Sequence, residues 1–123
     1  MRYIMMLLVL LSGQVTAHQW TPTYPELKYS HVEGILKVRM ELFNSRKDVS
    51  HFEVSVFDKD WNSIKFAVSE RIMKVNYLGR KSIDIYIRET DKYNATYVCS
   101  RSKTITEKEE VAIVTSRICS KIK

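Results

Sequence analysis

A chain of 123 residues, 45% of them hydrophobic, can bury one core and is too short for two domains of ordinary size. The net charge of +6 favours acidic partners. Nucleic acid is not expected among them, because the basic residues are spread over the whole chain and because the chain opens with an export signal.

The first 17 residues predict that signal. Arg2 precedes an unbroken apolar run at positions 4–11, and the small-residue sequence VTA at 15–17 supplies a cleavage site that would make His18 the N-terminus. The run is much shorter than the about 20 residues of a membrane-spanning helix, so no stable membrane span is expected. We therefore predict an exported protein, periplasmic or secreted. The alternative is an uncleaved segment that lies at the membrane surface.

Residues 18–26, which contain two prolines, predict an irregular leader before a domain at 27–123. In that domain apolar and polar residues alternate with period 2, which is typical of half-buried strands. The predicted strands lie in the segment PELKYSHV and at 36–42, 52–56, 72–78, 83–87, 95–103 and 111–122. Seven short antiparallel strands predict an all-β, immunoglobulin-like seven-stranded sandwich without helices.

Cys99 and Cys119 are the only two cysteines. Export would carry this pair into an oxidising compartment, where it is expected to form a disulfide. The hairpin between the two cysteines would turn near Glu109, so the bridge should join neighbouring strands. The alternative is two free buried thiols in a reducing compartment.

The last predicted strand has two different faces. Val114, Ile118 and Ile122 share the apolar face, which leaves Cys119 on the other one. The sequence A-x-Y-x-C at 95–99 would instead turn its cysteine inward, but the apolar alternation of the last strand is the clearer pattern. Pairing the cysteines places three further pairs opposite each other: Arg101 and Arg117, Lys103 and Thr115, Tyr97 and Lys121.

Four basic residues would then share one exposed face: Arg101, Lys103, Arg117 and Lys121. Like charges directly opposite each other destabilise a strand pair by a few tenths of a kcal/mol. Such a face is either a site for an anionic group or a solvated surface that opposes aggregation.

No catalytic, metal or cofactor site is predicted. Asp58, Asp60 and Asn62 match the opening of a calcium loop, but the glycine and glutamate that complete such a loop are missing, so we predict a turn. His18 could bind copper only with a second histidine and further ligands that the spacing does not indicate. No nucleophile motif or glycine-rich loop is present, so an enzyme is not expected.

Three segments resemble, in order and spacing, strands of the N-terminal domain of PapD-type periplasmic chaperones, which assemble pili (fimbriae). They are GILKVRMELFNSRKDVSHFEVSVFD, SERIMKVNYLGRKSIDIYIR and VAIVTSRICSKI, and the resemblance runs from about Lys28 to Ile122. In that family a strand ending in Asn leads into a polar turn, and an L-x-P-G-x corner precedes the fifth strand. Here the corner at 77–79 lacks the proline, and the chain ends where the family's second domain would begin.

The resemblance implies a way of working. Chaperones of this family lend their last N-domain strand to the sheet of an immature subunit, and a basic pair in the cleft between two domains holds the subunit's C-terminal carboxylate. By resemblance Val114, Ile118 and Ile122 would be the donor row, and Arg117 or Lys121 the carboxylate anchor.

We therefore expect a non-catalytic binding module for a protein partner, a single-domain chaperone-like protein that acts by strand pairing. The alternative is a structural or surface domain, for example virion- or envelope-associated, that binds through its loops. In that case the loops NSRKDVS and DKDWNS, the second with Trp61 at its tip, would make the contact.

Overall fold

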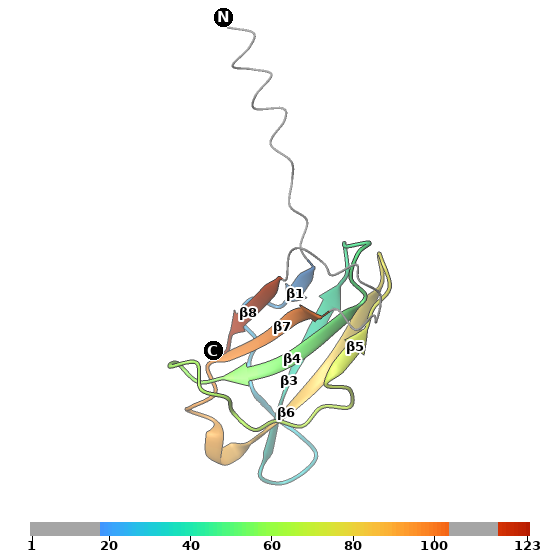
Figure 1. The fold of residues 1–123 in the computed structure, drawn as a ribbon. Coiled ribbons are helices and arrows are strands. Elements are labelled where there is room, and N and C mark those ends of the chain that lie inside the picture. Colours follow the sequence, from blue (N-terminus) through green and yellow to red (C-terminus); the bar gives the residue numbers. More distant parts are fainter. Residues whose placement is uncertain (1–17, 104–115) are drawn as a thin grey trace, which may run out of the picture.

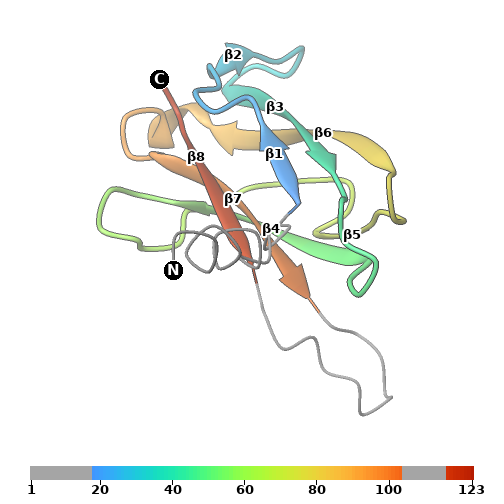
Figure 2. The ribbon, with the colours of Figure 1, turned by 90° about the horizontal axis from the view of Figure 1, so that it is seen from above.

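The computed structural model describes residues 18–103 and 116–123. Two antiparallel four-stranded sheets pack face to face as a β-sandwich (Figures 1 and 2). In the first sheet β3 pairs with β6 along one edge and with β1 and β2 along the other; the second sheet has the order β5-β4-β7-β8. The strands are β1 (Gln19–Thr21), β2 (Lys28–Tyr29), β3 (Ile35–Phe43), β4 (His51–Phe57), β5 (Ile72–Lys74), β6 (Arg80–Arg88), β7 (Tyr97–Lys103) and β8 (Arg117–Lys121), and a short 3₁₀ helix, η1 (Glu89–Asp91), follows β6.

The period-2 alternation of the sequence forms the core. Every second residue of β3, of β4 and of residues 83–87 in β6 is buried between the sheets, while the residues between them face outward. The buried residues of these strands are Leu36, Val38, Met40, Leu42, Phe52, Val54, Val56, Ile83, Ile85 and Ile87. The predicted immunoglobulin-like sandwich is therefore confirmed.

Two strand predictions need correction. The leader expected to be irregular contains β1, whose three residues pair with Glu41–Phe43 of β3. The strand predicted at 72–78 ends at Lys74 because the chain then turns through a corner. In this corner Leu78 has a positive φ of 62°, and its backbone N–H donates to the Asn44 carbonyl. Of the strand predicted at 111–122, residues 111–115 lie outside the described residues.

Asn44, the last residue before the polar turn that follows β3, holds this end of the sandwich together. Its fully buried side-chain amide donates to the carbonyls of Val49 and Val75, both at 2.8 Å. Its side-chain oxygen accepts the backbone N–H of Arg46. One amide thus satisfies three buried backbone groups that no strand ladder pairs.

The segment Thr23–Pro25, called here the crossing segment, leaves β3 and runs beside β8. The Lys121 N–H donates to the Thr23 carbonyl, and the Lys123 N–H donates to the Pro25 carbonyl. The N-terminal part of the described chain therefore contacts both sheets in turn: β3 through β1, then β8, then β3 again through β2.

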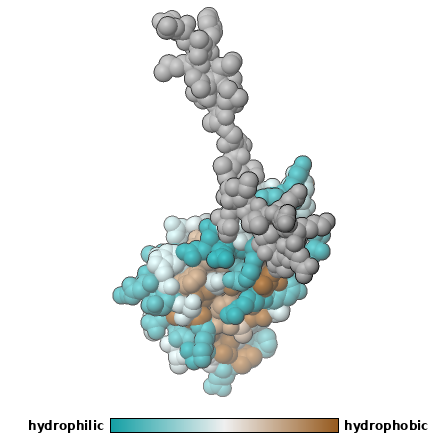
Figure 3. All heavy atoms as spheres, viewed as in Figure 1, coloured by the Kyte–Doolittle hydropathy of each residue, from teal (hydrophilic) through white to brown (hydrophobic). Residues whose placement is uncertain are grey.

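Among the described residues no helix is long and apolar enough to cross a membrane. On the face seen in Figure 3 hydrophobic residues reach the surface in several places among hydrophilic ones. The large exposed hydrophobic residues are Tyr24, Tyr29, Val32, Trp61, Ile72, Tyr77, Leu78 and Tyr93. They are distributed over loops and strand ends. Candidate binding surfaces are therefore the places where these residues lie next to charged side chains.

Candidate functional site

The cysteine pair joins the two strands that carry most of the predicted site residues. Cys99 on β7 and Cys119 on β8 lie opposite each other and form a disulfide, as predicted. The register is also the predicted one, with Arg101 opposite Arg117 and Tyr97 opposite Lys121. The predicted site residue Val114 and the predicted cross-strand residue Thr115 lie outside the described residues.

The orientation of β8 follows its own apolar alternation. Ile122 is buried in the core and Ile118 packs against it from a half-buried position. The alternate residues Arg117, Cys119 and Lys121 therefore face away from the core, and both basic residues are exposed. Replacing the isoleucines would thus disturb the core as well as any contact made through them.

The outer faces of β7 and β8 carry basic side chains, but not all of them are free. Arg101, Arg117 and Lys121 are exposed. Lys103 is half-buried, and its Nζ donates to a carboxylate oxygen of Glu53 on the neighbouring strand β4 at 2.8 Å. This hydrogen bond lowers the pKa of Glu53 below its usual value. The net basic character of the surface therefore comes from the other three residues.

The loop that follows β4 is a turn held by Asp58, not a calcium loop. The Asp58 carboxylate accepts the backbone N–H groups of Asp60 and Asn62, each at 2.9 Å, and the Asn62 side-chain amide at 3.2 Å. These hydrogen bonds, led by the Asn62 backbone N–H, lower the pKa of Asp58. Trp61 at the tip has a positive φ of 66°, which directs its ring back toward the second sheet.

The Trp61 ring lies flat on the Tyr97 ring of β7, with the centroids 4.3 Å apart and the planes 1° from parallel. Phe57 at the end of β4 contacts Trp61 from the side, with the centroids 5.8 Å apart. The Arg117 guanidinium of β8 lies 5.0 Å from the Trp61 ring and 5.4 Å from the Phe57 ring. Arginine in this position is attracted by the ring electrons, an interaction of about 0.5–1 kcal/mol at an exposed site.

The structure thus brings the loop residue and the last strand, which the sequence treats as alternatives, into one surface. We call it the aromatic–basic surface; it consists of Phe57, Trp61, Tyr97, Arg101, Arg117 and Lys121. Trp61 is 47% exposed, so part of its aromatic side chain remains accessible to a partner. The sequence does not predict Phe57 as part of this surface, and it predicts Tyr97 only as the residue opposite Lys121, because the contacts of both with Trp61 depend on which strands are neighbours.

Beside this surface, β8 has an outer backbone edge that no strand ladder pairs within the described residues, and β1 lies close to it. The Ile122 N–H donates to the Thr96 carbonyl, so it points toward β7. Backbone groups alternate sides along a strand, so the N–H and C=O groups of Arg117 and Cys119, at odd positions, point away from β7. The crossing segment pairs only with the later residues of β8. Within the described part of the chain, the outward backbone groups of Arg117 and Cys119 have no hydrogen-bond partner.

A buried polar cluster lies on the inner side of the same strands. The His18 ring contacts the hydroxyl of Ser100 through Nε2 at 2.7 Å and that of Ser116 through Nδ1 at 3.1 Å. Burial, with a smaller effect of the nearby Arg46 charge, lowers the pKa of His18 to about 4. Arg46 itself is buried and binds the Asp48 carboxylate through two hydrogen bonds of 3.0 and 2.6 Å.

The cluster is buried: His18 is 1% exposed and Ser100 is fully buried. Its hydrogen bonds join the residue that precedes β1 to β7 and to the start of β8. Among the described residues the His18 ring nitrogens contact serine hydroxyls and no other histidine: His31 is in the turn after β2, and His51 contacts Ser50. Within the described ranges, no three His, Cys, Asp or Glu side chains gather in a way that could hold a metal ion.

Two antiparallel sheets, with an N-terminal segment that contacts both of them in turn, form an immunoglobulin-like β-sandwich whose fold is similar to that of PapD-like domains. Among solved structures it is similar to the E. coli chaperone DraB, with a TM-score of 0.60 and 12% identity over 89% of this chain and 54% of that one. It is also similar to the ASH / PapD-like domain (PapD-like domain 7) of human CEP192, with a TM-score of 0.54 and 8% identity over 91% of this chain and 92% of that one.

These likenesses show the fold, and they confirm the predicted resemblance to PapD-type domains at that level. The chain spans about half the length of the DraB chain it matches. No protein-family model matches the sequence, and no curated protein matches it.

Proposed function

We propose that the protein is an exported, non-catalytic binding module that pairs a strand of a protein partner with the outward edge of β8. The observation that carries this proposal is that the outward backbone groups of Arg117 and Cys119 have no hydrogen-bond partner among the described residues, at the β8 edge of a sheet whose other edge is β5. Backbone hydrogen bonds along such an edge supply affinity, and side chains next to it supply specificity. The similarity in fold to the chaperone DraB supports a protein partner.

The aromatic–basic surface supplies the side chains next to the edge. An exposed tryptophan held flat on a tyrosine buries apolar area without losing much side-chain freedom on binding, because the stack is already formed. Arg101, Arg117 and Lys121 add positive charge, so a partner strand with acidic residues is favoured.

Export to the periplasm or the outside of the cell is part of the same proposal. The Cys99–Cys119 disulfide is the kind of bond that persists in an oxidising compartment. Residues 1–17 would act as the signal peptide. The mass of the exported protein tests this directly, since cleavage after Ala17 leaves His18 as its first residue.

Proline substitution separates strand pairing from side-chain contacts. The Arg117 N–H points away from β7, so Arg117→Pro removes an outward donor and the side chain while it keeps every bond to β7. Arg117→Ala removes the side chain alone and is the matched control. Strand pairing predicts that proteins crosslinked to the tagged chain in a periplasmic extract are lost in Arg117→Pro and kept, at reduced yield, in Arg117→Ala. Circular dichroism and the disulfide mass check that both variants are folded.

A second candidate is a structural or surface domain, for example envelope- or virion-associated, that binds through its loops. The exposure of Trp61 favours it. In that case Trp61→Ala abolishes binding, whereas the proline and alanine variants of Arg117 behave alike. Binding that is unchanged in Arg117→Pro would refute strand pairing at this edge.

A further inference from the structure

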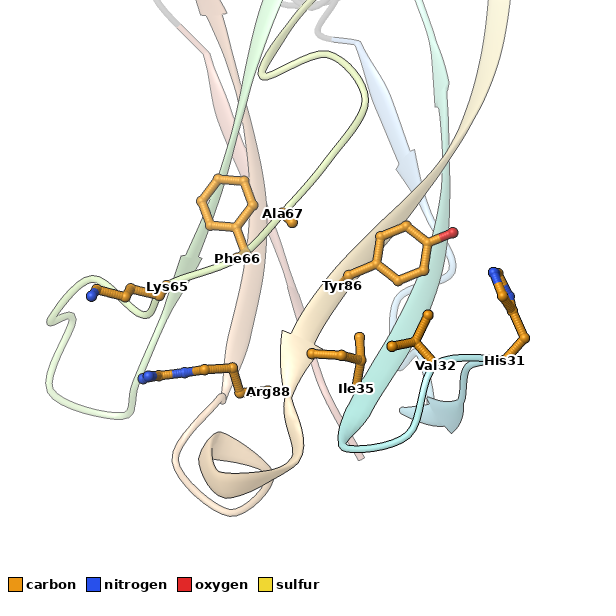
Figure 4. Close-up of a pocket in the computed structure, with 8 residues that line it drawn as sticks. All are labelled: His31, Val32, Ile35, Lys65, Phe66, Ala67, Tyr86 and Arg88. Atoms are coloured by element: carbon orange, nitrogen blue, oxygen red, sulfur yellow. The ribbon is translucent and has the colours of Figure 1, made fainter.

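A groove of about 390 Å³ lies on the opposite sheet, away from the aromatic–basic surface. Its floor is formed by Ile35 of β3 and Tyr86 of β6, which face outward, and its walls by Val32, in the turn after β2, and Phe66, in the connection after β4 (Figure 4). The volume falls in the range of small-molecule sites, which is about 300–1,000 Å³.

Backbone hydrogen bonds hold the two walls in place. Ala67 pairs with Tyr86 through two backbone hydrogen bonds of 2.9 and 2.8 Å, which fix Phe66 against the edge of β6. On the other side the Ile35 N–H donates to the Val32 carbonyl at 3.2 Å. The groove is therefore built into the sheet and does not require a loop to move before it can be filled.

The apolar character of the lining is unusual for an outer face. Val32 is 51% exposed, and Phe66 is only half-buried although the core packs against its other side. Water in contact with these side chains is displaced favourably by an apolar group, at roughly 25 cal/mol for each Å² covered.

The charges at the rim have one sign. Lys65 and Arg88 extend in the same direction, and their charged ends lie on the side of the groove away from His31 (Figure 4). Arg88 is bound to Asp91 through Nε and Nη2, whereas Lys65 has no acidic partner within the described ranges. No Asp or Glu lines the groove. A ligand with one negative group therefore complements it, and a positively charged ligand does not.

We propose that this groove binds a small amphipathic carboxylate, an acyl chain with its carboxylate at Lys65 and its apolar chain lying across Phe66, Ile35 and Val32 toward His31. Lys65 supplies a charge-assisted hydrogen bond at one end, and the apolar lining supplies contact along the length. This site is independent of the proposed strand pairing, because it lies on the other sheet.

Decanoate below its micelle concentration is the probe, with 1-decanol and decylammonium as its neutral and cationic counterparts. Backbone amide NMR titration of the full exported chain should give saturable shifts at residues 31–35, 65–67 and 86–88 with decanoate. Lys65→Met keeps the apolar stem and removes the charge, so it should weaken decanoate binding about tenfold or more, which is the effect of one charge-assisted hydrogen bond, and leave 1-decanol unchanged.

Two further variants make the result specific. Ala67 is exposed at the groove, so Ala67→Phe should fill it and abolish binding of both ligands without disturbing the core. Lys74 is an exposed lysine on the other sheet, and Lys74→Met should have no effect. The proposal is overturned if no binding saturates, if the shifts fall elsewhere, if decylammonium binds as tightly as decanoate, or if Lys65→Met behaves like Lys74→Met.

Discussion

Removing the disulfide tests how much the bridge between β7 and β8 contributes to the free energy of unfolding. Cys99 and Cys119 are separated by 20 positions, and a bridge that closes a loop of that size restricts the unfolded chain by about 3 kcal/mol. Alanine is the appropriate replacement for both, because Cys99 is buried and a serine hydroxyl there would need a hydrogen-bond partner. The double variant should therefore be about 3 kcal/mol less stable than the wild type.

Urea unfolding followed by tryptophan fluorescence measures this difference. With a slope of about 1–3 kcal/mol per M urea for a domain of this size, the midpoint should fall by about 1–3 M. Reduction of the wild type should reproduce the shift, and the same reductant should leave the double variant unchanged. A loss of less than about 1 kcal/mol would refute the reasoning, since it would mean that the bridge does not restrict the unfolded chain.

Three other predictions concern stability. Asn44→Ala leaves the Val49 and Val75 carbonyls and the Arg46 N–H unpaired, so the free energy of unfolding should fall by about 2–4 kcal/mol in a urea titration, and a loss below 1 kcal/mol would contradict the role of the amide. Leu78→Asn should raise the free energy of unfolding by about 0.5 kcal/mol, which thermal unfolding would show as a higher melting temperature, because asparagine tolerates the positive φ of this exposed corner better than leucine does. The pKa of His18 is about 4 in the folded protein and 6.5 in the unfolded chain, so the unfolded state takes up the proton first as the pH falls. The free energy of unfolding should therefore fall by up to about 3 kcal/mol between pH 6.5 and pH 4. His18→Gln should remove that part of the pH dependence.

The features that the sequence predicts are those that depend on neighbours along the chain or on one buried face. Alternation at 36–42 and 83–87 indicates strands because each has one face in the core. The cysteine spacing indicates both the bridge and the register of the last hairpin, because a hairpin between them must turn midway.

Features that depend on contacts between distant parts of the chain could not be predicted. β1 has three residues, and its one strong signal is Trp20, whose indole N–H reaches the Val98 carbonyl across the sandwich. The pairing of Lys103 with Glu53 requires β4 and β7 to be neighbours in the sheet, and this adjacency cannot be predicted from the order of the strands along the chain. The stack of Trp61 on Tyr97 could not be predicted for the same reason, because it too requires β4 and β7 to be neighbours.

The crossing segment makes the two ends of the β8 edge different, because it pairs with the later residues of β8 and, among the described residues, leaves the earlier ones unpaired on that side. It already occupies the N–H groups of Lys121 and Lys123, so under the proposed strand pairing an added strand would run toward residue 117 and would end before residue 121. Edge strands that accept partners in several registers tend to form open-ended assemblies. Under the proposed strand pairing, the protein's own N-terminal residues would therefore limit how far an added strand, from a partner or from a second copy of this chain, can run along β8.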